Sequence, residues 1–148
     1  MEKLRMMLVD DEERFLATTQ KLLAKKGYDV VTASSGSEAL EKIRAHNIHV
    51  VILDVKMPGM DGIATLKEIK RQFPLTEVIM LTGHATLESA IDGLKSGAVD
   101  YLMKPADIDE VIQKAKEVFE KRKGLEEKIR VAQMRKVMRS PGQIIQDS

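Results

Sequence analysis

The sequence predicts an α/β protein with three layers, αβα, built around a five-stranded parallel sheet. Two observations lead to this fold class. Short apolar runs alternate along the chain with segments whose apolar residues recur at the helical period. The connections are short, and strands that alternate with helices of about ten to fifteen residues form βαβ units. Because such crossovers are right-handed, we expect helices on both faces of the sheet.

The predicted strands are apolar runs that end at polar residues. His49–Asp54 contains the run VVIL, which is typical of a central strand buried on both faces. Glu77–Thr82 has the same character, whereas Tyr28–Ala33 alternates in polarity. In chain order, the predicted strands are Arg5–Asp10, Tyr28–Ala33, His49–Asp54, Glu77–Thr82 and Val99–Met103.

The predicted helices show the helical period and recognisable ends. Glu12–Lys26 places its apolar residues on one face and stops before Gly27, a residue typical just past a helix end. Asp107 caps the fifth helix, because Asp accepts hydrogen bonds from N–H groups of a first turn. In chain order, the predicted helices are Glu12–Lys26, Ser37–His46, Asp61 or Gly62 to about Gln72, Ala85–Ser96, and a long helix from Asp107 past residue 120.

The chain divides into a domain over residues 1–123 and a helical extension or linker over residues 124–148 with a disordered end. The whole chain has 148 residues, of which 43% are hydrophobic and 32% charged, as in one globular domain. Apolar residues at four-three spacing continue into the extension at Leu125 and Ile129, although Arg122 and Gly124 interrupt the seam. Both a solvated helix and a dimer contact therefore stay open.

Composition excludes several classes of function. There is no cysteine, which excludes disulfides, thiolate metal sites and cysteine nucleophiles. Tryptophan is absent and aromatic residues make up 3%, so we expect no direct nucleic-acid binding by this chain. No apolar run approaches the roughly 20 residues of a membrane span. The N-terminus is not a secretory signal, and we expect a cytoplasmic protein without membrane contact.

Polar residues follow four of the predicted strands at their carboxyl ends. Asp10 and Asp11 follow the first strand, Asp54 ends the third, Thr82 ends the fourth and Lys104 follows the fifth. The carboxyl ends of parallel strands share one edge, where ligands bind in open α/β folds. These side chains are therefore expected to converge.

Three crowded carboxylates repel one another, at about 4 kcal/mol for two charges 4 Å apart with an effective dielectric constant near 20. Such a cluster protonates, gathers cations or binds a metal. Carboxylate oxygens without histidine or cysteine suit Mg²⁺. A carboxylate beside Mg²⁺ and a lysine can attack phosphorus and form an aspartyl-phosphate.

Four motifs, LVDDEERF, ILDVKMPGMDG, IMLTGHA and GAVDYLMKP, carry a family resemblance through their sequences and their spacing. Over about residues 3–123 the chain resembles the receiver domain of bacterial two-component response regulators. The resemblance implies a flavodoxin-like receiver fold with strand order 2-1-3-4-5. It also implies a signalling switch that accepts a phosphoryl group from a phosphohistidine of a sensor histidine kinase or phosphotransfer protein.

The resemblance assigns the acids of the site. Asp54 is expected to be the phosphoacceptor. Asp10 and Asp11 are expected to bind Mg²⁺ together with Asp54, Asp11 being the more direct ligand. The main-chain carbonyl of Lys56 is expected to complete the protein ligands, and the Lys56 side chain flanks the phosphoryl group.

The resemblance also assigns the residues that respond to phosphate. Thr82 is expected to be the switch hydroxyl, and His84 flanks the phosphoryl group. Lys104 is expected to contact a phosphoryl oxygen, and its peptide bond to Pro105 is expected to be cis. Tyr101 is expected to change rotamer on the face formed by the fourth helix, fifth strand and fifth helix.

Simpler interpretations exist for single residues. Asp10 and Asp11 could be acids that a helix N-terminus favours. Thr82 could cap the following helix, and Tyr101 could be a static strand residue. Ala106 departs from the family, which often has a large apolar residue after the Lys-Pro pair.

Alternative functions also stay open. The resemblance implies a domain that catalyses only its own phosphorylation and dephosphorylation, and no other enzyme activity. A phosphatase of the haloacid-dehalogenase type also uses an aspartyl nucleophile, but Asp54-Val55-Lys56 lacks that family's second acid. A receiver-like scaffold that is never phosphorylated is the other alternative. A homodimer could form through the fourth-helix, fifth-strand and fifth-helix face or through the C-terminal helix.

Overall fold

The structure is a computed structural model that describes residues 3–55, 61–83 and 87–138. Its five strands form one parallel sheet in the order β2-β1-β3-β4-β5, which confirms the predicted fold class and strand order. The strands are β1 (Met6–Val9), β2 (Val30–Ala33), β3 (Val50–Leu53), β4 (Glu77–Thr82) and β5 (Asp100–Met103). The helices are α1 (Glu13–Lys25), α2 (Gly36–Ala45), α3 (Gly62–Gln72), α4 (Leu87–Lys95) and α5 (Ile108–Val137).

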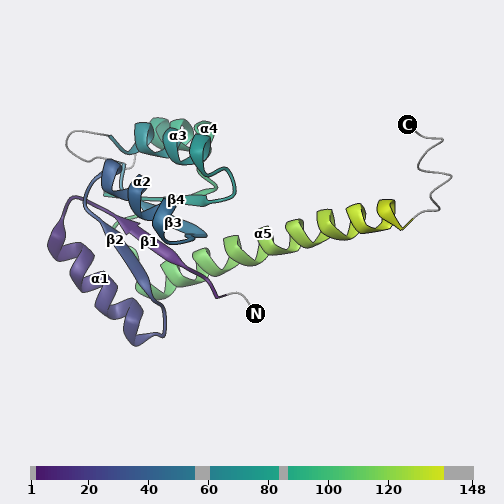
Figure 1. Ribbon diagram of the computed structural model, residues 1–148. Coiled ribbons are helices and arrows are strands. Elements are labelled where there is room, and N and C mark those ends of the chain that lie inside the picture. Colours follow the sequence, from purple (N-terminus) through teal and green to yellow (C-terminus); the bar gives the residue numbers. More distant parts are fainter. Residues whose placement is uncertain (1–2, 56–60, 84–86, 139–148) are drawn as a thin grey trace.

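The sheet is buried on both faces because its strand residues alternate between two apolar clusters. Met6 and Leu8 of β1 contact the cluster that includes residues of α1 and α5. Met7 and Val9 contact the cluster that includes residues of α2 and α3. Figure 1 shows the same division, with α1 and α5 on one side of the sheet and α2, α3 and α4 on the other. This two-sided burial explains why the central strands are wholly apolar.

Polar side chains fix where two of the predicted helices begin. Asp61 accepts a hydrogen bond of 2.7 Å from the backbone N–H of Ala64 at the start of α3. Asp107 accepts one from the N–H of Asp109 at the start of α5. Both bonds satisfy first-turn N–H groups that lack a partner within the helix. The predicted starts of these helices are confirmed.

Helix α5 is longer than the sheet that it packs against. Its buried residues end at Val118 and Phe119, and the helix then projects from the body (Figure 1). It runs through Gly124 without a break, and Leu125 and Ile129 beyond it are about half exposed. The predicted disordered end falls on residues outside the described part.

In the part of the chain that the structure describes, no helix combines the length and apolar character that a membrane span needs.

Gly62 allows α3 to begin directly against the chain that leaves β3. Its N–H donates a hydrogen bond of 2.6 Å to the carbonyl of Val55. A Cβ at this position would lie 2.4 Å from both the Asp54 carbonyl oxygen and the Val55 Cα. These are backbone atoms, so a side chain here requires a shift of the segment that carries Asp54.

We expect Gly62→Ala to lower the free energy of unfolding by about 1–3 kcal/mol, as overpacking does in other proteins. Urea denaturation measures the change. Gly124→Ala is the control, because nothing lies within 4 Å of its added Cβ and it sits inside an exposed helix. This control should raise the stability by about 0.5–1 kcal/mol. Equal effects of the two substitutions would contradict the close approach at Gly62.

Candidate functional site

The sheet places two acids side by side. Val9 of β1 pairs with Leu53 of β3, so Asp10 and Asp54 follow at the same level. The N–H of Asp54 donates to the Val9 carbonyl at 2.9 Å, and the N–H of Asp10 donates to the carbonyl of Ala33 at 3.1 Å. The backbone ladder therefore continues one residue beyond the strands and holds both acids at the carboxyl edge.

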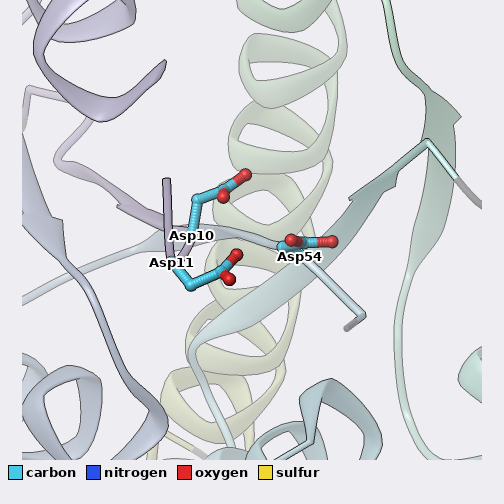
Figure 2. Close-up of side chains that lie close together, drawn as sticks. All are labelled: Asp10, Asp11 and Asp54. Atoms are coloured by element: carbon cyan, nitrogen blue, oxygen red, sulfur yellow. The ribbon is translucent and has the colours of Figure 1, made fainter. Parts of the chain in front are cut away.

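Asp11 joins these acids to form a cluster of three carboxylates. One oxygen of each of Asp10, Asp11 and Asp54 lies within 4.8 Å of the others. Figure 2 shows the three side chains gathered at the ends of β1 and β3. Asp10 and Asp54 are buried, whereas Asp11 is exposed. The cluster is thus open to solvent on the side of Asp11.

Lys104 brings a positive charge to the cluster from the end of β5. Its ammonium forms an ion pair with Oδ2 of Asp10 and lies 4.0 Å from Oδ2 of Asp54. The second oxygen of Asp10 accepts a hydrogen bond of 2.9 Å from the N–H of Glu12, just before α1. The Lys104–Pro105 peptide bond is cis, as expected.

The expected switch residues Thr82 and Tyr101 lie on the neighbouring strands β4 and β5. Thr82 is the last residue of β4, its backbone pairs with Met103, and its side chain lies outside the described part. Tyr101 is half-buried against the cluster that includes α2 and α3. Its hydroxyl is buried without a hydrogen-bond partner among the described residues. Lys56 and His84 lie outside the described residues.

The donor set of the cluster fits a magnesium ion. Among the described residues, these three carboxylates lie beside the Lys104 ammonium, and a further cation would relieve their mutual repulsion. Mg²⁺ prefers oxygen ligands and keeps several waters, and the exposed side at Asp11 leaves access for them. The arrangement therefore presents the Asp54 carboxylate close to two other carboxylates and to an ammonium.

Sequence reasoning missed one neighbour of this site. The Lys104 ammonium lies 4.3 Å from the centre of the Phe15 ring in α1. From the sequence alone, Phe15 is one of the apolar residues on one face of that helix. The sequence does show an aromatic residue shortly after the Asp10-Asp11 pair. It does not show that this residue contacts Lys104, because the two are far apart in sequence.

Comparison with known proteins identifies relatives of the chain. A family model of the response regulator receiver domain matches residues 6–116. The transcriptional regulatory protein ZraR of Escherichia coli (strain K12) is 44% identical over 108 residues, covering 73% of this chain and 24% of ZraR. The DNA-binding transcriptional regulator NtrC of Escherichia coli (strain K12) is 40% identical over 105 residues, covering 71% and 22%. The chain thus spans about a quarter of the length of these curated relatives.

Solved structures agree with this match. A response regulator receiver domain protein (CheY-like) from Methanospirillum hungatei JF-1 aligns with a TM-score of 0.78 and 32% identity, over 83% of this chain and 98% of that one. The receiver domain of NtrX from Brucella abortus aligns with a TM-score of 0.72 and 33% identity, over 78% and 98%. Neither the phosphatase nor the scaffold alternative is supported by these matches.

Receiver domains bind Mg²⁺ at an acidic pocket and receive phosphoryl groups from histidine kinases. This chain has the receiver sheet order and an aspartate cluster at its carboxyl edge. The chain belongs to the response regulator receiver family, the signalling domains of two-component systems.

Proposed function

We propose that Asp54 accepts a phosphoryl group from a phosphohistidine of a sensor histidine kinase or a phosphotransfer protein. The observation that carries this proposal is the position of the Asp54 carboxylate. It lies within 4.8 Å of Asp10 and Asp11 and 4.0 Å from the Lys104 ammonium. Asp54 is buried at the end of a central strand, so its carboxylate is held in place before the donor arrives.

An oxygen of Asp54 attacks phosphorus, the new O–P bond forms, and the P–N bond to the donor imidazole breaks. The imidazole nitrogen keeps the electron pair of that bond and takes up a proton. The Lys104 ammonium, which now pairs with Asp10, turns to a phosphoryl oxygen. A Mg²⁺ ion held by Asp10, Asp11, Asp54 and the Lys56 carbonyl would supply charge neutralisation for the phosphoryl oxygens.

The phosphoryl group then shifts an equilibrium between two conformations of the domain. It adds about −1.5 to −2 charges at pH 7. The Thr82 hydroxyl and the Lys104 ammonium then move to contact it. Tyr101 lies half-buried on β5, next to the strand that ends at Thr82, and its ring is expected to change rotamer when Thr82 moves. The face of α4, β5 and α5 changes with it.

The altered face is proposed to meet a second copy of the chain or another partner. It exposes apolar residues at Ile91 and Leu94 of α4 and at Met103 of β5. The extension of α5 offers a second apolar surface at Leu125 and Ile129.

We divide the chain into a receiver over residues 1–123 and a helical linker from residue 124, because the buried residues of α5 end at Phe119.

Incubation with acetyl phosphate and Mg²⁺ should add one phosphoryl group to the wild type and none to Asp54→Asn, because the amide is not a nucleophile toward phosphorus. Intact-protein mass spectrometry measures the gain, which should be lost after alkaline treatment. Asp29→Asn is the matched control, since this exposed residue precedes β2 at the opposite edge of the sheet. Undiminished labelling of Asp54→Asn would remove Asp54 from the role.

Magnesium should stabilise the wild type, by about 1.4 kcal/mol at a free concentration ten times the dissociation constant. Asp11→Ala should lose this response, because it removes one of the three carboxylates. Thermal unfolding with added Mg²⁺ and with EDTA measures both. In EDTA the variant should be at least as stable as the wild type, since repulsion within the cluster is relieved. Equal responses of the two proteins to Mg²⁺ would place the metal elsewhere.

Beryllofluoride, which mimics the phosphoryl group, should promote dimers that sedimentation equilibrium detects. Loss of the dimer in Leu125→Glu or Ile129→Glu would assign it to the C-terminal helix. Loss in Ile91→Glu or Leu94→Glu would assign it to the α4–β5–α5 face. A monomer in every condition would contradict the proposed self-association.

A further inference from the structure

The aromatic ring of Phe15 covers the ammonium of Lys104 on the side of α1. The Lys104 nitrogen lies 4.3 Å from the ring centre, well inside the range of a cation–π interaction. The two residues come from opposite ends of the domain sequence, and the same ammonium also pairs with Asp10. Phe15 is partly buried against the core cluster that includes residues of α1 and α5, so the core holds its ring.

The ring and the acids act on different parts of the same cation. Lys104 is 19% exposed and carries three N–H donors, and Asp10 accepts a bond from one of them. Asp54 lies 4.0 Å away. A ring face attracts the charge without the lone pairs of an acceptor oxygen, and it excludes water from that side. It therefore holds the ammonium in the site and leaves N–H donors for carboxylate or phosphoryl oxygens.

The neighbourhood of the ring fits this role. Phe15 and Ala106 both pack against the same core cluster and line the same open groove between α1 and the start of α5. Ala106 directly follows the Lys104-Pro105 pair. Phe15 is the aromatic residue among those that line this groove.

We propose that Phe15 is a positioning residue for Lys104, and that its ring sets the rate at which Asp54 gains a phosphoryl group. The proposal rests on the proposed function of Asp54. Without the ring, water hydrates the ammonium and the lysine side chain samples positions outside the acid cluster. Phosphorylation then slows although no group that touches the phosphoryl donor has been removed.

Phe15→Leu should slow phosphorylation by acetyl phosphate by roughly two- to tenfold, the range of a partly desolvated cation–π contact. Phe15→Tyr keeps the ring and should restore the wild-type rate. Phe73→Leu is the matched control, because its ring lies 6.0 Å from the Arg44 guanidinium, at the C-terminus of α3. A slow Phe15→Tyr, or a Phe15→Leu as fast as the control, would overturn the proposal.

A double-mutant cycle tests whether Phe15 acts through Lys104. In a Lys104→Met background, Phe15→Leu should cause no further loss of rate, since the cation is already gone. An undiminished effect in that background would show that the ring acts by another route and would refute the proposal. Urea denaturation of each variant verifies that the protein is folded during the assay.

A readout without phosphorylation separates this proposal from the function of Asp54. The ring current of Phe15 should shift the Lys104 ε-methylene proton signals upfield in the wild type, and Phe15→Leu should abolish the shift. Unshifted signals in the wild type would overturn the positioning role even if Asp54 is phosphorylated normally. A normal shift in a protein that takes up no phosphoryl group would instead refute the proposed function alone.

Discussion

The register between β1 and β3 is the constraint on which the site depends. Val9 lies opposite Leu53, and the ladder runs one residue further to the acids Asp10 and Asp54. The same register sends Val9 and Leu53 into the cluster that includes α2 and α3. A slip by one residue would turn these side chains to the other face. The register between β1 and β3 therefore determines both the packing of the core and the placement of the carboxylates.

Within the described residues, the cluster of Asp10, Asp11 and Asp54 holds more negative than positive charge. Burial of Asp10 and Asp54 beside Asp11 is unfavourable for ionised carboxylates, and Lys104 supplies one positive charge. A magnesium ion, which receiver domains bind at an acidic pocket, would relieve the remaining repulsion. An apolar sheet thus carries a polar edge at which three carboxylates and the Lys104 ammonium lie together.

The end of α5 shows how tertiary packing changes the meaning of a sequence pattern. Apolar residues recur from Val118 to Ile129, although Arg122 and Gly124 interrupt the pattern. Only the structure shows that the buried residues of this helix end at Phe119, that Arg122 still lies 4.0 Å from Glu77 of β4, and that the helix then projects from the body. A long helix in water owes most of its stability to packing of its apolar face. The projecting half therefore differs physically from the half on the sheet, although both share one pattern.

The sequence by itself determined the fold class and the edge at which the acids meet. Apolar runs, helical periods and short connections are local features, and the parallel topology brings the carboxyl ends together. Only the tertiary structure decided that Lys104 pairs with Asp10, that Phe15 covers this lysine, and that Gly62 lies against the backbone of Asp54. These contacts join residues far apart in sequence or depend on distances of a few ångströms. Local sequence patterns determine which residues are buried and which end of a strand a residue follows. Side-chain packing determines the distances between residues that are far apart in sequence.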